Sequence, residues 1–291
     1  MGLGFARSYP EAQRTYDEAD AVLGFSLSRL CFEGPEADLT LTRNAQPAIL
    51  ATSIAIFRIW EQLGHPYDAV AGHSLGEWTA LVAAGALTFA DAVRLTALRG
   101  AFMQEAVPVG EGGMAAVIGL DLKGTRLLCA NASKPGEPVE AANLNGGGQI
   151  VISGHMAAVD RAVAASKAAG AKLAKKLPVS APFHSSLMTP AAERLALAMA
   201  DLKISAPRVP VVCNVTAGPT QDPAQIGKYL VQQVVAPVRW EESVQWLAAN
   251  GVTHAYEFGA GAVLRGLVKR IAPAIEVTAI GEPNELPGAQ P

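Results

Sequence analysis

The sequence predicts an α/β protein in which a large α/β domain carries an inserted small subdomain of ferredoxin-like type. Three observations support this prediction: helical periodicity over the first hundred residues, a Gly-x-Ser-x-Gly pentapeptide between an apolar run and a helix-like stretch, and a middle region that alternates short β-rich runs with helices. The predicted parts are a large domain of residues 1–109 and 180–280, a subdomain of residues 110–179, and a loose tail of residues 281–291.

Helices dominate the first part of the chain. Apolar residues recur at helical spacing, and Thr88 with Asp91 three residues later is a helix start signal. The predicted elements are helices at residues 10–23 and 41–63, a strand at 69–71, and helices at 77–87 and from 88 to about 100 or 103.

The middle of the chain has the element order of a split βαβ fold. The predicted elements are a strand at 114–120, a helix after residue 121, strands at 139–144 and 149–153, a helix at 156–169 and a strand at 172–179. This order is typical of a ferredoxin-like subdomain. Beyond it we expect a helix from residue 189, a strand at 209–215, helices at 223–235 and 241–250, a strand at 254–258 and a helix at 263–271.

The composition limits the classes of partner. The chain has 291 residues, half of them hydrophobic, and a net charge of −3, so we expect no nucleic-acid partner. The most membrane-like stretch, residues 47–60, is interrupted by polar residues and is shorter than the roughly 18 residues of a membrane span. No secretory signal opens the sequence, and three scattered cysteines indicate reduced thiols, so we expect a cytoplasmic protein without a membrane partner.

The pentapeptide Gly72-His73-Ser74-Leu75-Gly76 makes Ser74 the leading candidate nucleophile. A strand that turns sharply into a helix strains the serine backbone, and we expect both glycines to be required because larger residues would collide. The turn lifts the Ser74 hydroxyl clear of the sheet and directs the Leu75 amide and the helix N-terminus at a developing oxyanion. A structural turn of the same sequence is the alternative interpretation.

A serine nucleophile needs a base, and the chain has five histidines. The His73 side chain must leave the turn on the other side from that of Ser74. Three more stand in a loop or at strand ends, where a structural role is expected: His65, His155 and His254. His184 lies at the predicted exit from the subdomain, where an interdomain cleft would form; the residues alone leave its role open.

Arg99 is a candidate for binding an anion. Its neighbours at helical spacing are mostly apolar and include no carboxylate, whereas Arg94 has Asp91 three residues before it. The planar guanidinium of Arg99 would suit an incoming carboxylate in bidentate geometry. A snorkelling arginine that covers the core is the alternative.

Cofactor motifs are weak in this sequence. Gly259-Ala260-Gly261 follows a predicted strand, but Leu264 occupies the third glycine position of a dinucleotide motif. Histidines, cysteines and acids do not cluster at metal-ligand spacing. We therefore expect no metal and no permanently bound cofactor.

Five motifs along the chain carry a family resemblance: Gly72-His73-Ser74-Leu75-Gly76-Glu77, Leu98-Arg99-Gly100-Ala101-Phe102-Met103-Gln104, Asn143-Leu144-Asn145, Ala181-Pro182-Phe183-His184-Ser185 and Tyr256-Glu257-Phe258-Gly259. Together they resemble the malonyl-CoA:acyl carrier protein transacylases, whose fold also forms the acyltransferase domain of polyketide and fatty acid synthases. The resemblance runs to about residue 271. It implies an α/β-hydrolase-like large domain with a parallel sheet, a ferredoxin-like insertion and a cleft between them.

The resemblance also implies roles for the matching residues. Ser74 would be the acylated nucleophile, His184 its general base, and Arg99 the partner of the malonyl carboxylate. A backbone carbonyl, expected near Arg239, would orient His184. The implied reaction is ping-pong, from malonyl-CoA as substrate to the phosphopantetheine thiol of acyl carrier protein, in fatty acid or polyketide biosynthesis. The length of the chain and its short tail favour a stand-alone enzyme, which we expect to be a monomer.

Further substrate contacts follow from the same resemblance. Leu75 would supply an oxyanion amide, Asn145 would lie at the substrate site, and Phe183 would crowd an α-methyl group and so favour malonyl over methylmalonyl about 10- to 200-fold. Gly147 replaces the family's proline in the loop after Asn145, so we expect that loop to be more mobile.

The start of the chain departs from the family. Relatives begin with a β-strand and a Gly-Gln-Gly-Ser-Gln loop that supplies a second oxyanion amide, whereas this sequence starts at Met1-Gly2-Leu3-Gly4. Loss of one such donor typically costs about 100- to 1000-fold in rate. A non-catalytic homologue that binds a partner is therefore one alternative function.

A serine esterase or thioesterase is the other alternative. In the chain order of a hydrolase triad, Ser74 would be followed by an acid and then by a histidine. Asp201 or Asp222 could be that acid, and His254 the histidine.

Overall fold

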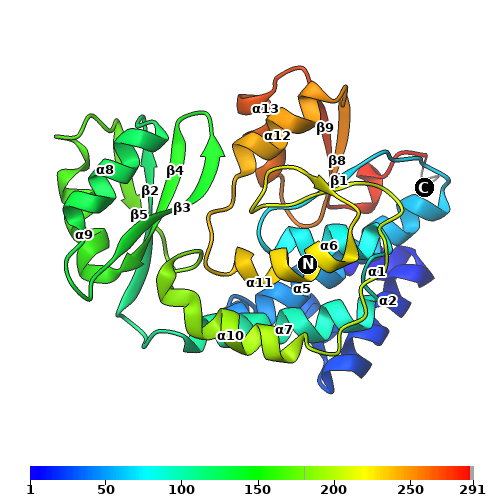
Figure 1. Cartoon of the computed structure of the whole chain (residues 1–291). Helices are drawn as coiled ribbons and strands as arrows, with labels where there is room; N and C mark the ends of the chain where they lie inside the picture. Colours follow the sequence, from blue (N-terminus) through cyan, green and yellow to red (C-terminus); the bar gives the residue numbers. More distant parts are fainter. Residues whose placement is uncertain (180, 289–291) are drawn as a thin grey trace.

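The computed structural model describes residues 1–179 and 181–288 (Figure 1). The domain boundary predicted at Ser180 and the last three residues of the predicted tail lie outside these described residues. The described chain mixes helices with small sheets, and the predicted α/β class is confirmed.

The first part of the chain is helical, as predicted. Its elements are α1 (Leu3–Ser8), α2 (Pro10–Leu23), α3 (Leu27–Glu33), α4 (Glu36–Leu39), α5 (Thr42–Gln62), β1 (Val70–Ala71), α6 (Leu75–Ala83) and α7 (Phe89–Glu105). The sequence did not predict α1, α3 and α4, because helices of four to seven residues give too few turns for a periodic signal. In the part of the chain that the structure describes, no helix combines the length and apolarity needed to cross a membrane.

The ferredoxin-like element order is confirmed. The elements are β2 (Gly112–Ile118), α8 (Leu122–Ala132), β3 (Val139–Gly146), β4 (Gln149–His155), α9 (Met156–Ser166) and β5 (Leu173–Lys176). The strands form an antiparallel sheet in the order β3-β4-β2-β5, and α8 and α9 cover one of its faces (Figure 1). Alternate residues of β2 bury both faces, because Ala115 and Val117 pack under the helices while Met114 and Ala116 face the rest of the molecule.

The chain then continues through short strands and further helices. The elements are η1 (Ser186–Met188), α10 (Thr189–Ala198), β6 (Val211–Val212), β7 (Pro219–Thr220), α11 (Pro223–Gln233), α12 (Trp240–Ala249), β8 (His254–Phe258), α13 (Val263–Ile271), β9 (Glu276–Ile280) and η2 (Pro283–Glu285). Parallel pairing joins β1 to β6 and β8 to β9, while β7 runs antiparallel to β6. The sequence analysis did not predict β9, which pairs in parallel with the preceding strand β8 across α13.

The C-terminal segment is packed over the residues that the structure describes. Leu286 is only 4% exposed and belongs to the main hydrophobic core. The Glu285 carboxylate accepts hydrogen bonds from the backbone N–H groups of Gly281 and Glu282, at 2.8 and 2.9 Å. The expectation of a loose tail from residue 281 is therefore wrong for this part of it, since a buried leucine anchors the segment.

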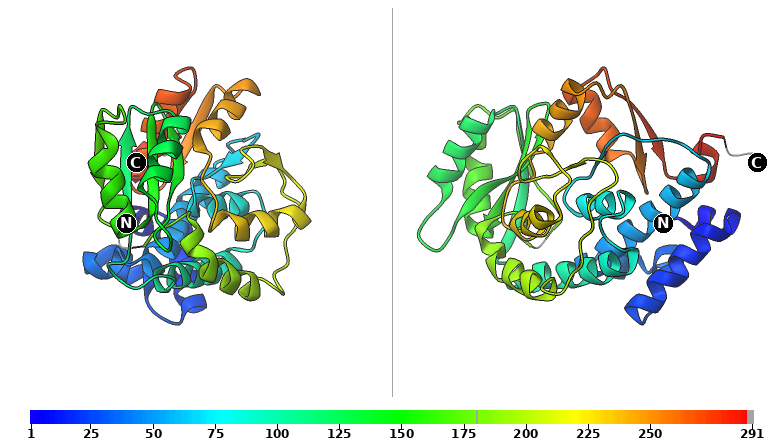
Figure 2. Two further views of the ribbon diagram at one scale, coloured as in Figure 1. Left: turned by 60° about the vertical axis from the view of Figure 1, so that its left-hand side comes forward. Right: turned by 45° about the vertical axis from the view of Figure 1, so that its right-hand side comes forward.

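The small subdomain is joined to the rest of the molecule along β3, which lies beside α12 and α13 in both views of Figure 2. The N–H of Leu144 donates to the Val238 carbonyl at 2.8 Å, and the N–H of Val238 donates to the Ala142 carbonyl at 2.9 Å. The loop after β3, expected to be mobile, lies against α13: a Cβ on Gly147 would lie 3.1 Å from Arg270 Cβ. We call this joint the β3 seam.

Candidate active site

The pentapeptide forms the predicted sharp turn from β1 into α6. Ser74 has φ 52° and ψ −107°, a left-handed conformation that costs free energy for a residue other than glycine. A Cβ on Gly72 would lie 2.0 Å from the Gly76 carbonyl carbon, whereas a Cβ on Gly76 would meet nothing within 4 Å. The expectation that both glycines are required is therefore wrong for Gly76, which lies in α6 with open space beside it.

Two alanine substitutions test this difference. Gly72→Ala should destabilise the protein by about 3 kcal/mol or more, because its methyl group collides with backbone that cannot move aside. Gly76→Ala should leave stability unchanged or raise it by up to about 1 kcal/mol, because alanine favours helix. The free energy of unfolding from urea titrations measures both, and equal effects would contradict this reading of the turn.

Ser74 and His184 form a hydrogen-bonded dyad. Ser74 Oγ and His184 Nε2 are 2.8 Å apart, and His184 Nδ1 donates to the backbone carbonyl of Gln233 at 2.8 Å. His184 is only 3% exposed and has φ 59°. With Nδ1 protonated, Nε2 presents its lone pair to the serine hydroxyl, the tautomer that a general base requires.

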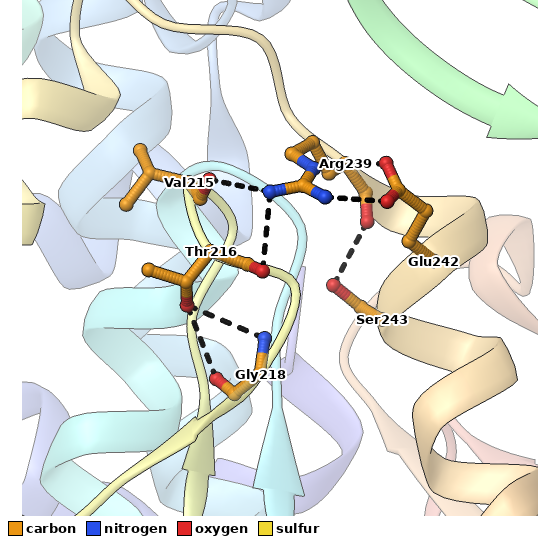
Figure 3. Close-up of polar contacts among 6 residues, drawn as sticks. All are labelled: Val215, Thr216, Gly218, Arg239, Glu242 and Ser243. Carbon is orange, nitrogen blue, oxygen red and sulfur yellow. Dashed lines mark hydrogen bonds and ion pairs between the residues drawn. The ribbon is translucent and has the colours of Figure 1, made fainter.

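The carbonyl expected near Arg239 does not orient His184. Figure 3 shows that the Arg239 carbonyl accepts the Ser243 hydroxyl, at 2.9 Å, in the first turn of α12. The Arg239 side chain donates to Glu242 and to the carbonyls of Val215 and Thr216, so it joins the loop after β6 to α12. Gln233, at the C-terminal end of α11, takes the predicted role.

Burial keeps His184 neutral. Desolvation, and then the positive charge of Arg99, lower the pKa of His184 from 6.5 to about 3. A neutral imidazole can accept the proton of Ser74 at every pH above that value.

The rate of Ser74 acylation should therefore be almost flat between about pH 5 and pH 8, since lowering the pH in this range does not protonate the base. Stopped-flow measurement of the first turnover gives this profile, and circular dichroism at each pH confirms that the protein stays folded. An acidic limb with a midpoint near 6.5 would show that His184 titrates like a solvated histidine.

Arg99 lies beside the dyad, as expected. It is 1% exposed, and its guanidinium donates to Gln46 Oε1 at 2.6 Å, to Gln233 Oε1 at 2.9 Å and to Ser74 Oγ at 3.1 Å. Burial lowers the pKa of Arg99 to about 10, which leaves it charged at neutral pH. Its hydrogen-bond partners are neutral, so the cation is available to an incoming carboxylate.

The other predicted substrate contacts lie around this centre. The Leu75 N–H is the first of α6 and has no acceptor within the described parts of the chain. Phe183 is half-buried and packs against both the main core and the inner face of the small sheet. Asn145 reaches from β3 to accept a hydrogen bond from His73 Nε2 at 2.9 Å. His73 therefore contacts the subdomain rather than Ser74.

Sequence reasoning assigned no role to four polar residues around Ser74: Gln46, Glu77, Asn214 and Gln233. All are buried, at 7%, 1%, 0% and 0% exposure. Glu77 stands next to the pentapeptide and was the only one with a local signal; a carboxylate in an otherwise apolar helix face needs a buried partner. The two residues beyond position 200 lie on elements whose approach to Ser74 only the fold reveals.

The hydrolase alternative lacks the required contacts. His254 is exposed, pairs with Thr253 at 3.0 Å, and lies 3.6 Å from Glu276. Asp222 caps α11 by accepting the Ala224 N–H at 2.9 Å. Among the described residues, no hydrogen bond connects His254 to Ser74. Separately, no three histidine, cysteine, aspartate or glutamate side chains in that part of the chain lie together as a possible metal site.

A serine on a strained turn, a neutral histidine held by a carbonyl and a nearby guanidinium form a site that can exchange acyl groups through a serine ester. Residues 1–270 match the acyl transferase domain family, and the chain belongs to that family. Similar curated proteins include the malonyl CoA-acyl carrier protein transacylases of Salmonella typhimurium, 50% identical over 98% of this chain and 92% of the relative, and of Bacillus subtilis strain 168, 47% identical over 98% and 90%.

Solved structures agree with this assignment. A malonyl CoA-acyl carrier protein transacylase from Coxiella burnetii superposes with a TM-score of 0.95 at 44% identity, over 98% of this chain and 90% of that one. A second structure, described as a type II PKS acyl-carrier protein in complex with its malonyl-transacylase, matches with a TM-score of 0.95 at 43% identity, over 98% and 93%. The acyltransferase class and the α/β fold predicted from the sequence are confirmed.

Proposed function

We propose that this protein transfers a malonyl group from malonyl-CoA to the phosphopantetheine thiol of an acyl carrier protein, through a malonyl ester on Ser74. The proposal rests on the position of Arg99. Its guanidinium is buried, lies 3.1 Å from Ser74 Oγ and forms its other hydrogen bonds with the neutral side chains of Gln46 and Gln233. An acyl group held on Ser74 that ends in a carboxylate would meet this cation. The names of the relatives support the same donor and acceptor.

The first half-reaction forms the serine ester. His184 Nε2 removes the proton as Ser74 Oγ attacks the thioester carbonyl, and the Leu75 N–H at the start of α6 stabilises the oxyanion. The intermediate collapses when the carbon–sulfur bond breaks, and His184 returns the proton to the departing coenzyme A thiolate. The second half-reaction is the reverse, with the thiol of the carrier protein as nucleophile.

Substrate choice rests on two side chains. Arg99 binds the malonyl carboxylate in place of its contact with the serine hydroxyl. Phe183, directly before the general base, crowds an α-methyl group and favours malonyl over methylmalonyl by about 10- to 200-fold. Asn145, which is hydrogen-bonded to His73, lines the side of the substrate site that the small subdomain forms.

The wider setting belongs to the same proposal. The carrier protein would serve fatty acid or polyketide biosynthesis, and the chain would act as a cytoplasmic monomer. Three free, buried cysteines in the described chain suit a reducing compartment.

Incubation with malonyl-CoA and either the holo or the apo form of an acyl carrier protein tests the function. Mass spectrometry of the carrier should show the added malonyl group only on the holo form, because the apo form lacks the acceptor thiol. Release of free malonate at the same rate with either form, and no loaded carrier, would instead identify a thioesterase.

A further inference from the structure

Glu77 is a buried carboxylate that the mechanism above does not use. It lies in the first turn of α6, three residues after Ser74, and is 1% exposed. Burial of a carboxylate is costly unless hydrogen bonds compensate. Here Glu77 Oε2 accepts the Gln233 side-chain Nε2 at 2.7 Å and the Asn214 backbone N–H at 2.9 Å.

The bond to Gln233 fixes which end of that amide faces Arg99. Gln233 Nε2 donates to Glu77 and, at 3.0 Å, to the Ser74 carbonyl, which leaves Oε1 to accept Arg99 at 2.9 Å. A flipped amide would direct its NH₂ group at the guanidinium and its oxygen at the carboxylate. Both contacts would be repulsive, because an ionised carboxylate accepts only and a guanidinium donates only.

The bond to Asn214 supports the nucleophile from the other side. Asn214 Oδ1 accepts the Ser74 N–H at 2.7 Å, and its Nδ2 donates to the Gly72 carbonyl at 2.7 Å. Glu77 holds the backbone of Asn214 and thereby this side chain against the strained turn. One carboxylate therefore connects the turn at Ser74 to Gln233, whose side chain binds Arg99 and whose backbone carbonyl holds His184.

The charge of Glu77 also matters to Arg99. Burial raises the pKa of Glu77, while the hydrogen bonds from Asn214 and Gln233 and the charge of Arg99 oppose that rise. In its ionised form Glu77 favours the protonated guanidinium and opposes the lowering of the Arg99 pKa by burial. The Gln233 amide bridges the two groups, so the carboxylate stabilises the cation without occupying its donors. A carboxylate in direct contact with Arg99 would compete with the substrate.

We propose that Glu77 is a positioning residue for the acyl carboxylate: through the Gln233 amide it orients Arg99 and supplies a counter-charge that leaves the guanidinium open. This inference rests on the proposed function. It assigns Glu77 to recognition of dicarboxylic acyl groups rather than to the fold alone.

The test compares first-turnover acylation of Ser74 by malonyl-CoA and by acetyl-CoA in Glu77→Gln. An amide at position 77 frees Gln233 to flip, so the malonyl rate should fall roughly 10- to 100-fold. The acetyl rate should fall much less, because acetyl has no carboxylate, and the ratio of the two rates should drop about tenfold or more. Glu36→Gln, at an exposed position in α4, is the matched control and should leave both rates unchanged.

The double variant with Glu77→Gln and Gln233→Glu covers the case in which the single variant does not fold. It retains the total charge and a donor–acceptor pair between the two side chains, but it places a carboxylate against Arg99. Its melting temperature should recover only in part, because a carboxylate at position 233 cannot donate to the Ser74 carbonyl as the amide does, and the malonyl-to-acetyl ratio should stay low.

An unchanged ratio in Glu77→Gln, or recovery of the wild-type ratio in the double variant, would refute the positioning role. Failure of the wild-type protein to form malonyl-serine would instead refute the proposed function.

Discussion

Ser74→Ala should abolish malonyl transfer, with a loss of about a million-fold in turnover, because no other group can form the ester. Ser74 Oγ is the only acceptor of the transferred group in the proposed mechanism, and it lies 2.8 Å from the base His184. The alanine variant should stay folded, since the strained backbone at position 74 is held by bonds to its N–H and carbonyl. Removing the hydroxyl leaves both bonds in place.

Intact-protein mass spectrometry after brief exposure to malonyl-CoA measures this result. The wild-type protein should gain one malonyl group and Ser74→Ala none. Ser205→Ala, which removes an exposed hydroxyl between α10 and β6, should be labelled like the wild type. A labelled Ser74→Ala protein would mean that another residue carries the acyl group.

Arg99→Ala should reduce malonyl acylation of Ser74 by about 100- to 1000-fold, since truncation of one partner of a buried charge pair costs several kcal/mol. Acetyl acylation should be much less affected, because acetyl presents no carboxylate to the missing cation. Arg99→Lys should recover only part of the malonyl rate, because an ammonium group retains the charge but cannot reproduce the fork that contacts Gln46 and Gln233.

Arg94→Ala is the matched control for this substitution. Arg94 lies five residues earlier on α7, is half exposed, and pairs at 3.5 Å with Asp91. It should leave both acylation rates unchanged. If the malonyl-to-acetyl ratio of Arg99→Ala equalled that of the wild type, Arg99 would have no part in substrate choice.

The sequence predicted those parts of the site that residues adjacent in the chain form. A strand, a serine flanked by glycines and a helix are contiguous, so the turn at Ser74 could be predicted with its strain. The roles of Arg99 and His184 came only from the family resemblance, because the residues around each allowed a structural role as well. Their meeting at Ser74 depends on contacts across 25 and 110 residues of chain.

The backbone carbonyl that orients His184 could not be predicted from the sequence. Every residue carries a carbonyl, so residue type gives no signal for one that holds a histidine. Gln233 takes that role because α11 ends there and its last carbonyls have no partner within the helix. The prediction near Arg239 was wrong by six residues for this reason.

The fold was predictable to a similar extent. The ferredoxin-like order emerged because each helix and strand there is long enough to show its period. The strands at β1 and β6 were predicted from apolar runs, but only two residues of each are paired in the structure, so the partner strand sets their bounds more than their own pattern does.

The β3 seam has a consequence for protein engineering. Val238, which pairs with β3, lies five residues after Gln233, whose carbonyl holds the His184 imidazole. In a chimera that exchanged only the inserted subdomain between relatives, residues 233–238 would have to pair with the β3 strand of another protein. We expect this mismatch to displace the Gln233 carbonyl and with it His184. Residues 233–238 should therefore be exchanged together with the insertion if the hybrid is to retain its catalytic alignment.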